Sequence, residues 1–170
     1  MKQASQYIQE LQNRVYQGRL NEIYIDASLI SKQSSRYIKA LETFISLYGD
    51  QEVIIFSTPG RSEICGNHTD HQHGRVVAAA VTLDMIGIVA KADDIYIQSD
   101  DITIDTISLN DLQIKENEKG TSTALVRGVV HRFQELGYQV GGFKGYFTSD
   151  VLIGSGLSSS AAFEVMIGTI

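Results

Sequence analysis

The segment Thr58–Gly74 carries an unusual density of side chains that can bind a ligand or take part in chemistry. Arg61, Asn67, His68 and Asp70 lie in it, and three of the chain's four histidines fall within six residues. One interpretation is the wall of a polar pocket, in which these four side chains offer hydrogen-bonding groups to a polyhydroxylated ligand. A solvated surface loop is the simpler alternative.

A metal site is a further interpretation of the same segment, because imidazole, thiolate and carboxylate groups are the usual ligands. The candidate ligands are Cys65, His68, Asp70, His71 and His73. All of them fall in one short stretch, whereas a closed metal site usually collects its ligands from separate elements. No second pair of candidate ligands follows downstream, so the spacing favours the pocket wall over the metal site.

A second segment, 153–162, reads Ile-Gly-Ser-Gly-Leu-Ser-Ser-Ser-Ala-Ala and lies between a predicted strand and a predicted helix. Gly154 and Gly156 permit a tight turn and a close approach of the backbone to a ligand. Three consecutive serines supply hydroxyl groups, and the first helical turn supplies free N–H groups at the positive end of the helix dipole. These groups predict an anion site suited to phosphate. The alternative is a turn followed by a serine N-cap.

Two common nucleotide-binding patterns are excluded for this segment. The Walker pattern requires a lysine after its second glycine, and none is present. The dinucleotide fingerprint requires a third glycine, where this chain has Ser159.

Hydrophobic periodicity predicts the elements that position these two segments. Helices are predicted at Tyr7–Val15, ending at Gly18, at Tyr37–Tyr48, ending at Gly49, at Leu125–Leu136, ending at Gly137, and from Phe163 onward. Strands are predicted at Val53–Ser57, stopping at Pro59, and at Met85–Ala90, Ile95–Ser99, Ile102–Ile107 and Phe143–Ile153. The polar stretch Asp111–Gly120 is expected to form a surface loop.

Composition limits the class of protein. The chain has 170 residues, 43% of them hydrophobic and 20% charged, which suits one ordinary globular domain and excludes a disordered chain. A net charge of −6 gives no overall basic surface for nucleic acid. The single cysteine excludes an intramolecular disulfide and suits a reducing compartment. The longest apolar stretch, Val76–Leu83, is far shorter than the ~20 residues that span a membrane. We therefore expect a cytoplasmic protein without membrane or nucleic-acid partners.

The two segments together resemble the galactokinase branch of the GHMP kinases. Pro59-Gly-Arg61, followed by Gly66-Asn-His-Thr-Asp70, is similar to the family's sugar-binding signature, P-G-R-x-N-L-I-G-E-H-T-D-Y. Residues 154–162 are similar to its nucleotide loop, G-x-G-L-S-S-S-A, and Val126-Arg-Gly-Val129 resembles the helix between the two motifs. The resemblance covers roughly residues 57–170, and the motifs occur in the family's order.

The resemblance implies an α+β fold, with a five-stranded mixed sheet backed by helices. The helical spacing of the first 50 residues predicts a helical N-terminal extension at residues 1–50, and the resemblance implies the N-terminal domain of a GHMP kinase at 51–170. The helical pattern still continues at Ile170, so we expect a piece of a longer protein whose C-terminal domain is missing here. The activity implied for the whole protein is transfer of the γ-phosphate of ATP, with Mg²⁺, to the anomeric hydroxyl of galactose or a related sugar. The piece alone is expected to be inactive.

Site roles follow from the same resemblance. Arg61 would lie beside the reacting hydroxyl, favour the ionised form of a neighbouring aspartate and stabilise developing charge. Asn67, His68 and Asp70 would bind the sugar, and Ser160 would contact Mg²⁺. The residues that would hold ATP are Gly154, Ser155, Gly156, Leu157, Ser158, Ser159 and Ser160.

The chain departs from the family pattern at four positions. Asn67 replaces a glutamate, His71 a tyrosine, Glu63 an asparagine, and Leu152 a proline. The first three departures bear on the identity of the sugar: galactose with a weakened contact, a different hexose or a uronic acid. Two other functions stay open, a non-catalytic sensor of sugar and ATP and a metal-dependent hydrolase that uses the histidine-rich segment.

Overall fold

The structure is a computed structural model that describes residues 1–66, 69, 72–100, 103–151 and 156–170. Its strands are β1 (Lys2–Gln3), β2 (Glu52–Cys65), β3 (Val77–Ala92), β4 (Ile95–Ser99), β5 (Thr103–Ile107) and β6 (Gly142–Ser149). Its α-helices are α1 (Ala4–Gln12), α2 (Gln17–Tyr24), α3 (Ile30–Tyr48), α4 (Ser122–Glu135) and α5 (Ser159–Thr169). Short 3-10 turns lie at Ala27–Leu29 and Glu116–Glu118, the second inside the predicted loop.

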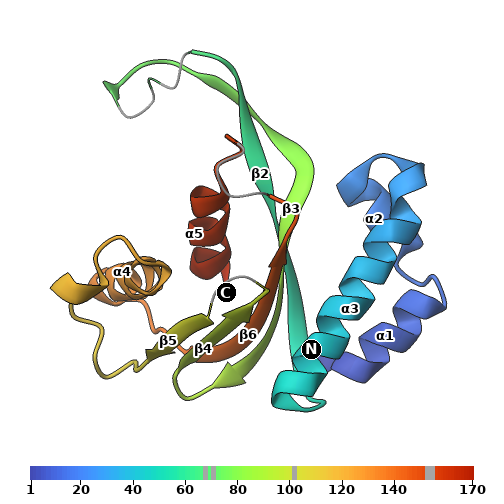
Figure 1. Cartoon of the computed structure of the whole chain (residues 1–170), viewed down its shortest axis with the longest axis horizontal. Coiled ribbons are helices and arrows are strands. Elements are labelled where there is room, and N and C mark those ends of the chain that lie inside the picture. Colours follow the sequence, from blue (N-terminus) through green and yellow to red (C-terminus); the bar gives the residue numbers. More distant parts are fainter. Residues whose placement is uncertain (67–68, 70–71, 101–102, 152–155) are drawn as a thin grey trace.

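The strands form one mixed sheet in the order β1-β2-β3-β6-β4-β5. The pair β4–β6 is parallel, and the other neighbouring strands are antiparallel. Helices α1–α3 cover one face of the sheet, and α4 and α5 lie on the other (Figure 1). The predicted α+β class, a mixed sheet backed by helices, is confirmed. The sheet has six strands rather than five in the described residues, because the two-residue strand β1 pairs with the start of β2.

Two apolar cores lie on the two faces of the sheet. Side chains alternate between the faces of a strand, so β3 contributes Ile86 and Ile88 to the core beneath α1–α3, and Val89 to the core beneath α4 and α5. β6 likewise contributes Tyr146 to the first core and Phe147 to the second. A strand segment buried on both faces is apolar along its length, which explains the buried stretch Ile86–Ala90 of β3, whereas residues 77–83 of the same strand are mostly exposed. The division of the chain at residue 50 stays a prediction, although α1–α3 share a core with the sheet.

Glycines mark one helix end correctly and another incorrectly. Gly49 ends α3 as predicted, with φ +80° and its N–H donating to the Ile45 carbonyl at 2.8 Å. The prediction that Gly18 ends the first helix is wrong. The chain has already turned at Arg14, whose φ is +60°, and Gly18 lies inside α2.

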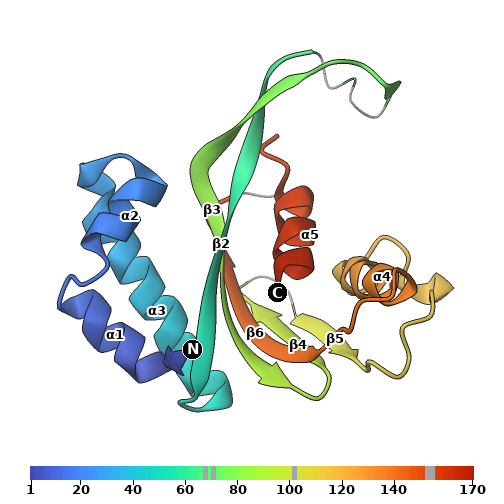
Figure 2. The ribbon, with the colours of Figure 1, turned by 180° about the vertical axis from the view of Figure 1, so that it is seen from behind.

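The prediction that the strand beginning at Val53 stops at Pro59 is also wrong, because β2 continues to Cys65. Pro59 pairs with Asp84, and the register shifts between Pro59 and Arg61. The proline thus lies at a bulge, where its missing N–H is tolerated. The extended β2 and the first half of β3 form a two-stranded ribbon that projects beyond the rest of the sheet (Figures 1 and 2).

The later elements lie close to their predicted ranges. β4 has the predicted bounds Ile95–Ser99. α4 ends at Glu135, just before Gly137 with its φ of +85°. β6 ends at Ser149, earlier than predicted, because the chain bends at Asp150 and Val151; the predicted strand end at Ile153 lies outside the described residues. Within the described ranges, no helix is long and apolar enough to cross a membrane.

Candidate functional site

Arg61 lies on the projecting ribbon, directly after the bulge in the β2–β3 pair, where it pairs with Ala80 and β3 carries the extra residues. A bulge changes the direction in which the following side chain points. Arg61 Nε and Nη2 donate hydrogen bonds to Ser158 Oγ at 3.3 and 3.1 Å, and its backbone N–H donates to the Leu157 carbonyl at 3.0 Å. The structure therefore brings the arginine of one predicted segment into contact with two residues of the other.

Gly60 permits this contact because the chain before α5 passes very close to β2. A Cβ at position 60 would lie 3.1 Å from the Leu157 carbonyl oxygen and 3.2 Å from both methyl groups of Val151. Contacts this short are tighter than ordinary van der Waals distances, so a larger residue would push the two segments apart.

Ser158 precedes α5 in a left-handed conformation, with φ +59° and ψ +50°. Its side chain makes no capping hydrogen bond to the helix, so the alternative of a simple serine N-cap does not describe this residue. The hydroxyl instead accepts from Arg61. Gly156 also has a positive φ of +75°, and a Cβ there would face open space. The need for glycine at 156 is therefore conformational.

A cavity of about 230 Å³ adjoins the start of α5. Its lining is mainly apolar, with hydroxyl groups and one carboxylate among the side chains. The apolar lining residues are Met85, Ile97, Ile104, Leu125, Phe147, Val151 and Phe163. The polar lining residues are Ser99, Asp100, Ser122, Thr148, Ser149, Ser159 and Ser160. Such a mixture suits a ligand with a flat apolar part and polar substituents.

The carboxylate of Asp100 is held in place at the cavity wall. It accepts a hydrogen bond from the Thr148 hydroxyl at 2.9 Å and another from the Tyr146 hydroxyl.

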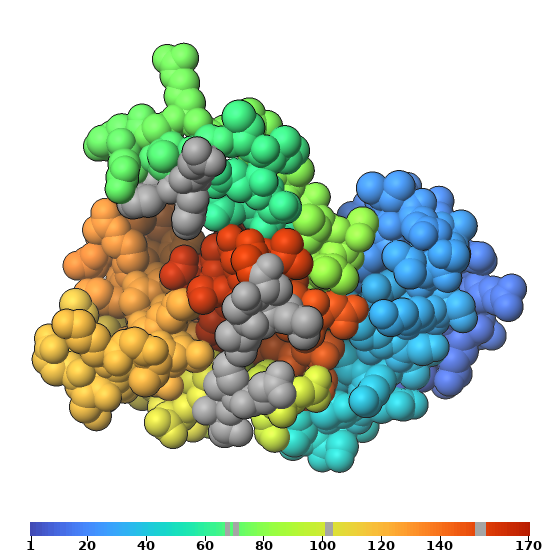
Figure 3. Space-filling view, turned by 45° about the horizontal axis from the view of Figure 1, so that its top comes forward, coloured from blue at the N-terminus to red at the C-terminus, as the bar shows by residue number. Residues whose placement is uncertain are grey.

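The space-filling view shows the start of α5 (red) between the ribbon (green) and α4 (orange), while the N-terminal helices (blue) lie to one side (Figure 3).

The remaining predicted site residues lie outside the described residues. They are Asn67, His68, Asp70, Gly154 and Ser155, and their roles stay predictions. The metal-site alternative also stays a prediction, because three of its candidate ligands, His68, Asp70 and His71, lie outside the described residues. Among the residues that the structure does describe, no group of three or more His, Cys, Asp or Glu side chains could hold a metal ion.

Sequence reasoning missed a buried ion pair between Arg36 of α3 and Asp84 of β3. The side chain of Asp84 is 3% exposed and lies 2.5 Å from Arg36 Nη1 of α3. Asp84 also accepts hydrogen bonds from the hydroxyls of Tyr24 at 2.8 Å and Ser57 at 2.5 Å. Burial raises the pKa of Tyr24, as do Tyr37 and Asp84 beside it, so the phenol stays a donor. A lone aspartate beside an eight-residue apolar run was the available signal, because a buried carboxylate requires a partner.

Comparison with known proteins shows which family this chain resembles. The family model described as the galactokinase galactose-binding signature matches residues 42–91. The galactokinase of Pyrococcus furiosus is 36% identical over 115 residues, which cover 67% of this chain and 32% of that protein. The galactokinase of Streptococcus mutans is 31% identical over 131 residues, covering 75% of this chain and 34% of that protein.

A solved structure agrees with the sequence comparisons. The crystal structure of Lactococcus lactis galactokinase complexed with galactose superposes with a TM-score of 0.67 at 28% identity, covering 75% of this chain and 34% of that one. The chain matches the N-terminal part of proteins in the galactokinase family. It spans about a third of the length of the galactokinases it matches. The crystal structure of Methanococcus jannaschii mevalonate kinase, at 22% identity and a TM-score of 0.55, shares the fold over 68% of this chain and 38% of that one.

Proposed function

We propose that the whole protein is a galactokinase-like sugar kinase, which transfers the γ-phosphate of ATP to the anomeric hydroxyl of galactose or a related sugar. The contact between Arg61 and Ser158 carries this proposal. It joins the arginine of the galactose-binding signature to Ser158, the first of the three consecutive serines in the nucleotide loop. A sugar held beside the ribbon and a phosphate held at α5 would therefore meet at the guanidinium.

Arg61 is suited to the reaction by its chemistry. Phosphoryl transfer depends on placing the two reactants in line and on stabilising charge that develops on the transferred group. A guanidinium keeps its positive charge at every physiological pH and offers a planar set of donors that matches phosphate oxygens. A side chain that already lies at the start of α5 can make those bonds without a large rearrangement.

The nucleotide would occupy the cavity beside α5. The apolar side chains of Met85, Phe147 and Phe163 offer surface for a flat base. The N-terminus of α5 offers free N–H groups and the positive end of its dipole to the phosphates. The cavity and the helix start are contiguous, because Ser159 and Ser160 belong to both.

Mg²⁺ is compatible with this arrangement. The ion usually takes most of its ligands from substrate phosphates and water, and only one or two from protein. The Ser160 hydroxyl at the cavity wall can supply one such ligand. When bound, the ion neutralises negative charge on the phosphates.

Turnover by the full-length protein tests the proposal. ADP release is measured with Mg²⁺-ATP and galactose, galacturonate and other hexoses, and we expect release that depends on a sugar. Residues 1–170 alone serve as a control that we expect to be inactive, because they span only a third of a galactokinase. If the full-length protein binds both ligands without turnover, the sensor alternative is correct. Activity that requires a transition metal and no ATP would favour the hydrolase.

A further inference from the structure

We propose that Arg36 of α3 is a positioning residue for the nucleotide site, through which the N-terminal helices hold the strand and the chain that lead into α5. The proposal rests on the proposed function, because it assigns nucleotide binding to the cavity. Arg36 lies outside both the family-model match at 42–91 and the span of the motif resemblance. Arg36 and its contacts from α3 therefore come from a part of this chain that the galactose-binding signature does not cover.

The guanidinium of Arg36 is buried, with its side chain 12% exposed, and it bridges two strands. Nη1 lies 2.5 Å from Asp84 Oδ1, and Nη2 donates to the backbone carbonyls of Asp84 at 2.8 Å and Thr148 at 3.2 Å. Asp84 belongs to β3 and Thr148 to β6, so one side chain fixes the spacing of these strands where their pairing ends, at Met85 and Ser149.

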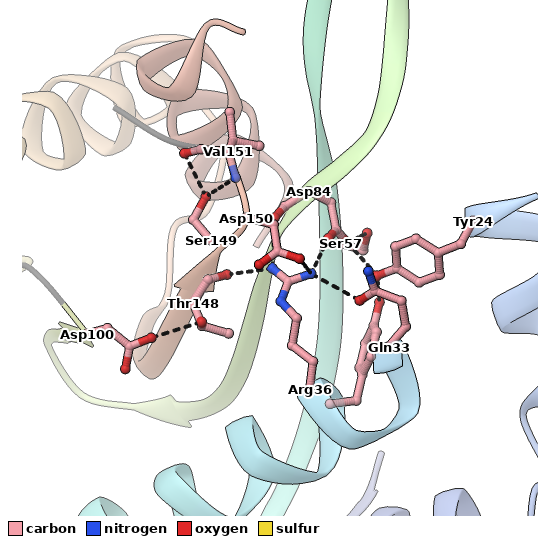
Figure 4. Close-up of polar contacts among 11 residues, drawn as sticks. Tyr24, Gln33, Arg36, Ser57, Asp84, Asp100, Thr148, Ser149, Asp150 and Val151 are labelled. Carbon is pink, nitrogen blue, oxygen red and sulfur yellow. Dashed lines mark hydrogen bonds and ion pairs between the residues drawn. The ribbon is translucent and has the colours of Figure 1, made fainter. Parts of the chain in front are cut away.

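The same guanidinium reaches the residue that follows β6. Nη1 lies 3.5 Å from Asp150 Oδ2. The backbone N–H of Asp150 donates at 2.9 Å to the Asp84 carbonyl, which also accepts from Arg36. Val151, the next residue, accepts from and donates to the Ser149 hydroxyl, and its methyl groups approach Gly60. Asp150 is thus held where the chain leaves the sheet for the nucleotide loop (Figure 4).

A second route leads from Arg36 to the cavity wall. The Thr148 carbonyl accepts from Arg36, while the Thr148 hydroxyl donates to Asp100 at 2.9 Å. Thr148, Ser149, Val151 and Asp100 all line the cavity, and Arg36 is not among its lining residues. Thr148 lies between Asp100 and Arg36 (Figure 4). Arg36 therefore acts on the nucleotide site through other residues and does not touch the cavity.

Arginine is required here because its planar fork serves several acceptors at once. A lysine retains the charge beside Asp84 but is a single point donor, so it cannot hold the Asp84 carboxylate and the Thr148 carbonyl together. A glutamine would leave the Asp84 carboxylate buried without its cation. Arg36→Lys thus preserves the ion pair while removing the bridge, and it separates positioning from bulk stability.

The experiment uses the full-length protein and its Arg36→Gln and Arg36→Lys variants. Arg19→Gln is the matched control, since Arg19 lies exposed on α2 and pairs only locally with Glu22 among the described ion pairs. Affinities for ADP and for galactose are measured separately by calorimetry. We expect both Arg36 variants to bind ADP about five- to tenfold more weakly, a size typical of residues that act through a packed network. Galactose affinity should change by less than about twofold.

Hydrogen exchange at the Asp150 amide adds a measurement that needs no ligand. We expect exchange there to quicken in both Arg36 variants and to stay unchanged in Arg19→Gln, with the amide of Val130 in α4 as an internal reference. If Arg36→Gln does not fold, Arg36→Lys carries the test.

Three results would overturn the inference: parental ADP affinity in a folded Arg36→Lys, equal losses for both ligands, or unchanged exchange at Asp150. Failure of the parent to bind ADP would instead contradict the proposed function, and the exchange experiment would still decide whether Arg36 holds this segment.

Discussion

Arg61 on β2 and Ser158 before α5 are joined by two hydrogen bonds of 3.3 and 3.1 Å, although 97 positions separate them in the chain. The bond lengths fall in the range of ordinary to long hydrogen bonds, and the acceptor is a neutral hydroxyl. Such a contact can exchange for a phosphate oxygen, which is a stronger, charged acceptor. The site is therefore assembled in advance, with the guanidinium directed toward the proposed nucleotide loop.

Replacing Arg61 by lysine tests its part in the reaction. Arg61→Lys keeps the positive charge and loses the planar fork. In the full-length protein we expect kcat to fall on the order of 100-fold, the usual effect of removing one donor that stabilises the transition state. The affinity for ATP should stay nearly intact in a binding assay without sugar. An unchanged kcat would mean that Arg61 only holds the ribbon against α5.

Gly156→Val tests the conformation of the nucleotide loop. A β-branched residue at φ +75° is strained by about 1–3 kcal/mol, although a side chain there would meet open space. We expect weaker binding of ATP and a lower melting temperature. Gly128→Ala is the control, because Gly128 has comparable free space but lies within α4, where alanine is favoured by ~1 kcal/mol. Equal effects of the two substitutions would contradict this prediction.

Asp84→Asn tests the buried ion pair through its effect on stability. The amide cannot accept from Tyr24, Ser57 and Arg36 as the carboxylate does, and it leaves the guanidinium only the more distant Asp150 carboxylate, at 3.5 Å. We expect the free energy of unfolding, measured in urea, to fall by about 3–5 kcal/mol. The exposed Asp105 of β5 supplies the comparison, and Asp105→Asn should change stability very little. A loss below about 1 kcal/mol for Asp84→Asn would show that the carboxylate is dispensable.

Glu118 makes stability depend on pH. The hydrogen-bonded guanidinium of Arg127, at 2.7 Å, lowers the pKa of Glu118 below its ordinary value of 4.5. A carboxyl group with a lowered pKa in the folded state stabilises the protein above its unfolded pKa, and this contribution is lost as the pH falls through its folded pKa. We expect Glu118→Gln to be less stable near neutral pH and to lose less stability on acidification.

Urea unfolding at several acidic and neutral pH values measures this dependence. Glu116→Gln, which changes an exposed residue of the same 3-10 turn, is the control and should follow the parent. Parallel pH curves for Glu118→Gln and the parent would refute the role of the ion pair.

Asn67→Glu tests the choice of sugar in the full-length protein. The substitution restores the carboxylate of the family signature, and a charge-assisted hydrogen bond contributes about 1.5–3 kcal/mol against roughly 1 kcal/mol for a neutral one. We expect kcat/KM for galactose to rise several-fold and that for galacturonate to fall, because two carboxylates repel each other. If neither value changes, Asn67 does not face the sugar.

Local signals in the sequence predicted the parts of the fold that depend on neighbouring residues. Gly49 ends α3 because the conformation that terminates a helix suits a residue without a side chain. The bounds of β4 follow from β-branched residues between turns. The strand end predicted at Pro59 was wrong because a proline ends a strand only where its missing N–H is needed, and β3 bulges opposite this position. The end of α1 could not be predicted from local signals either, because the chain turns at Arg14 and no glycine marks that turn in the sequence.

The candidate site was predictable only in its residues and not in its contacts. The motifs identified Arg61 and Ser158 separately, and nothing in their spacing indicated that one binds the other. The bridge from Arg36 to Asp84 and Thr148 was invisible for the same reason. It joins α3 to two strands across 48 and 112 positions, and no local pattern specifies which buried carboxylate an arginine will reach.

The place of β6 in the sheet has a consequence for how the chain folds. β6 pairs with β3 along its whole length and with β4 in parallel, yet among the described strands of this sheet it comes last in chain order. Before residues 142–149 arrive, the β2–β3 pair and the β4–β5 pair have no strand between them, and each presents an unpaired edge. Insertion of β6 joins the two halves in one step and brings together segments far apart in sequence, which slows folding. During synthesis these two strand pairs are thus exposed to edge-to-edge aggregation until β6 docks between them.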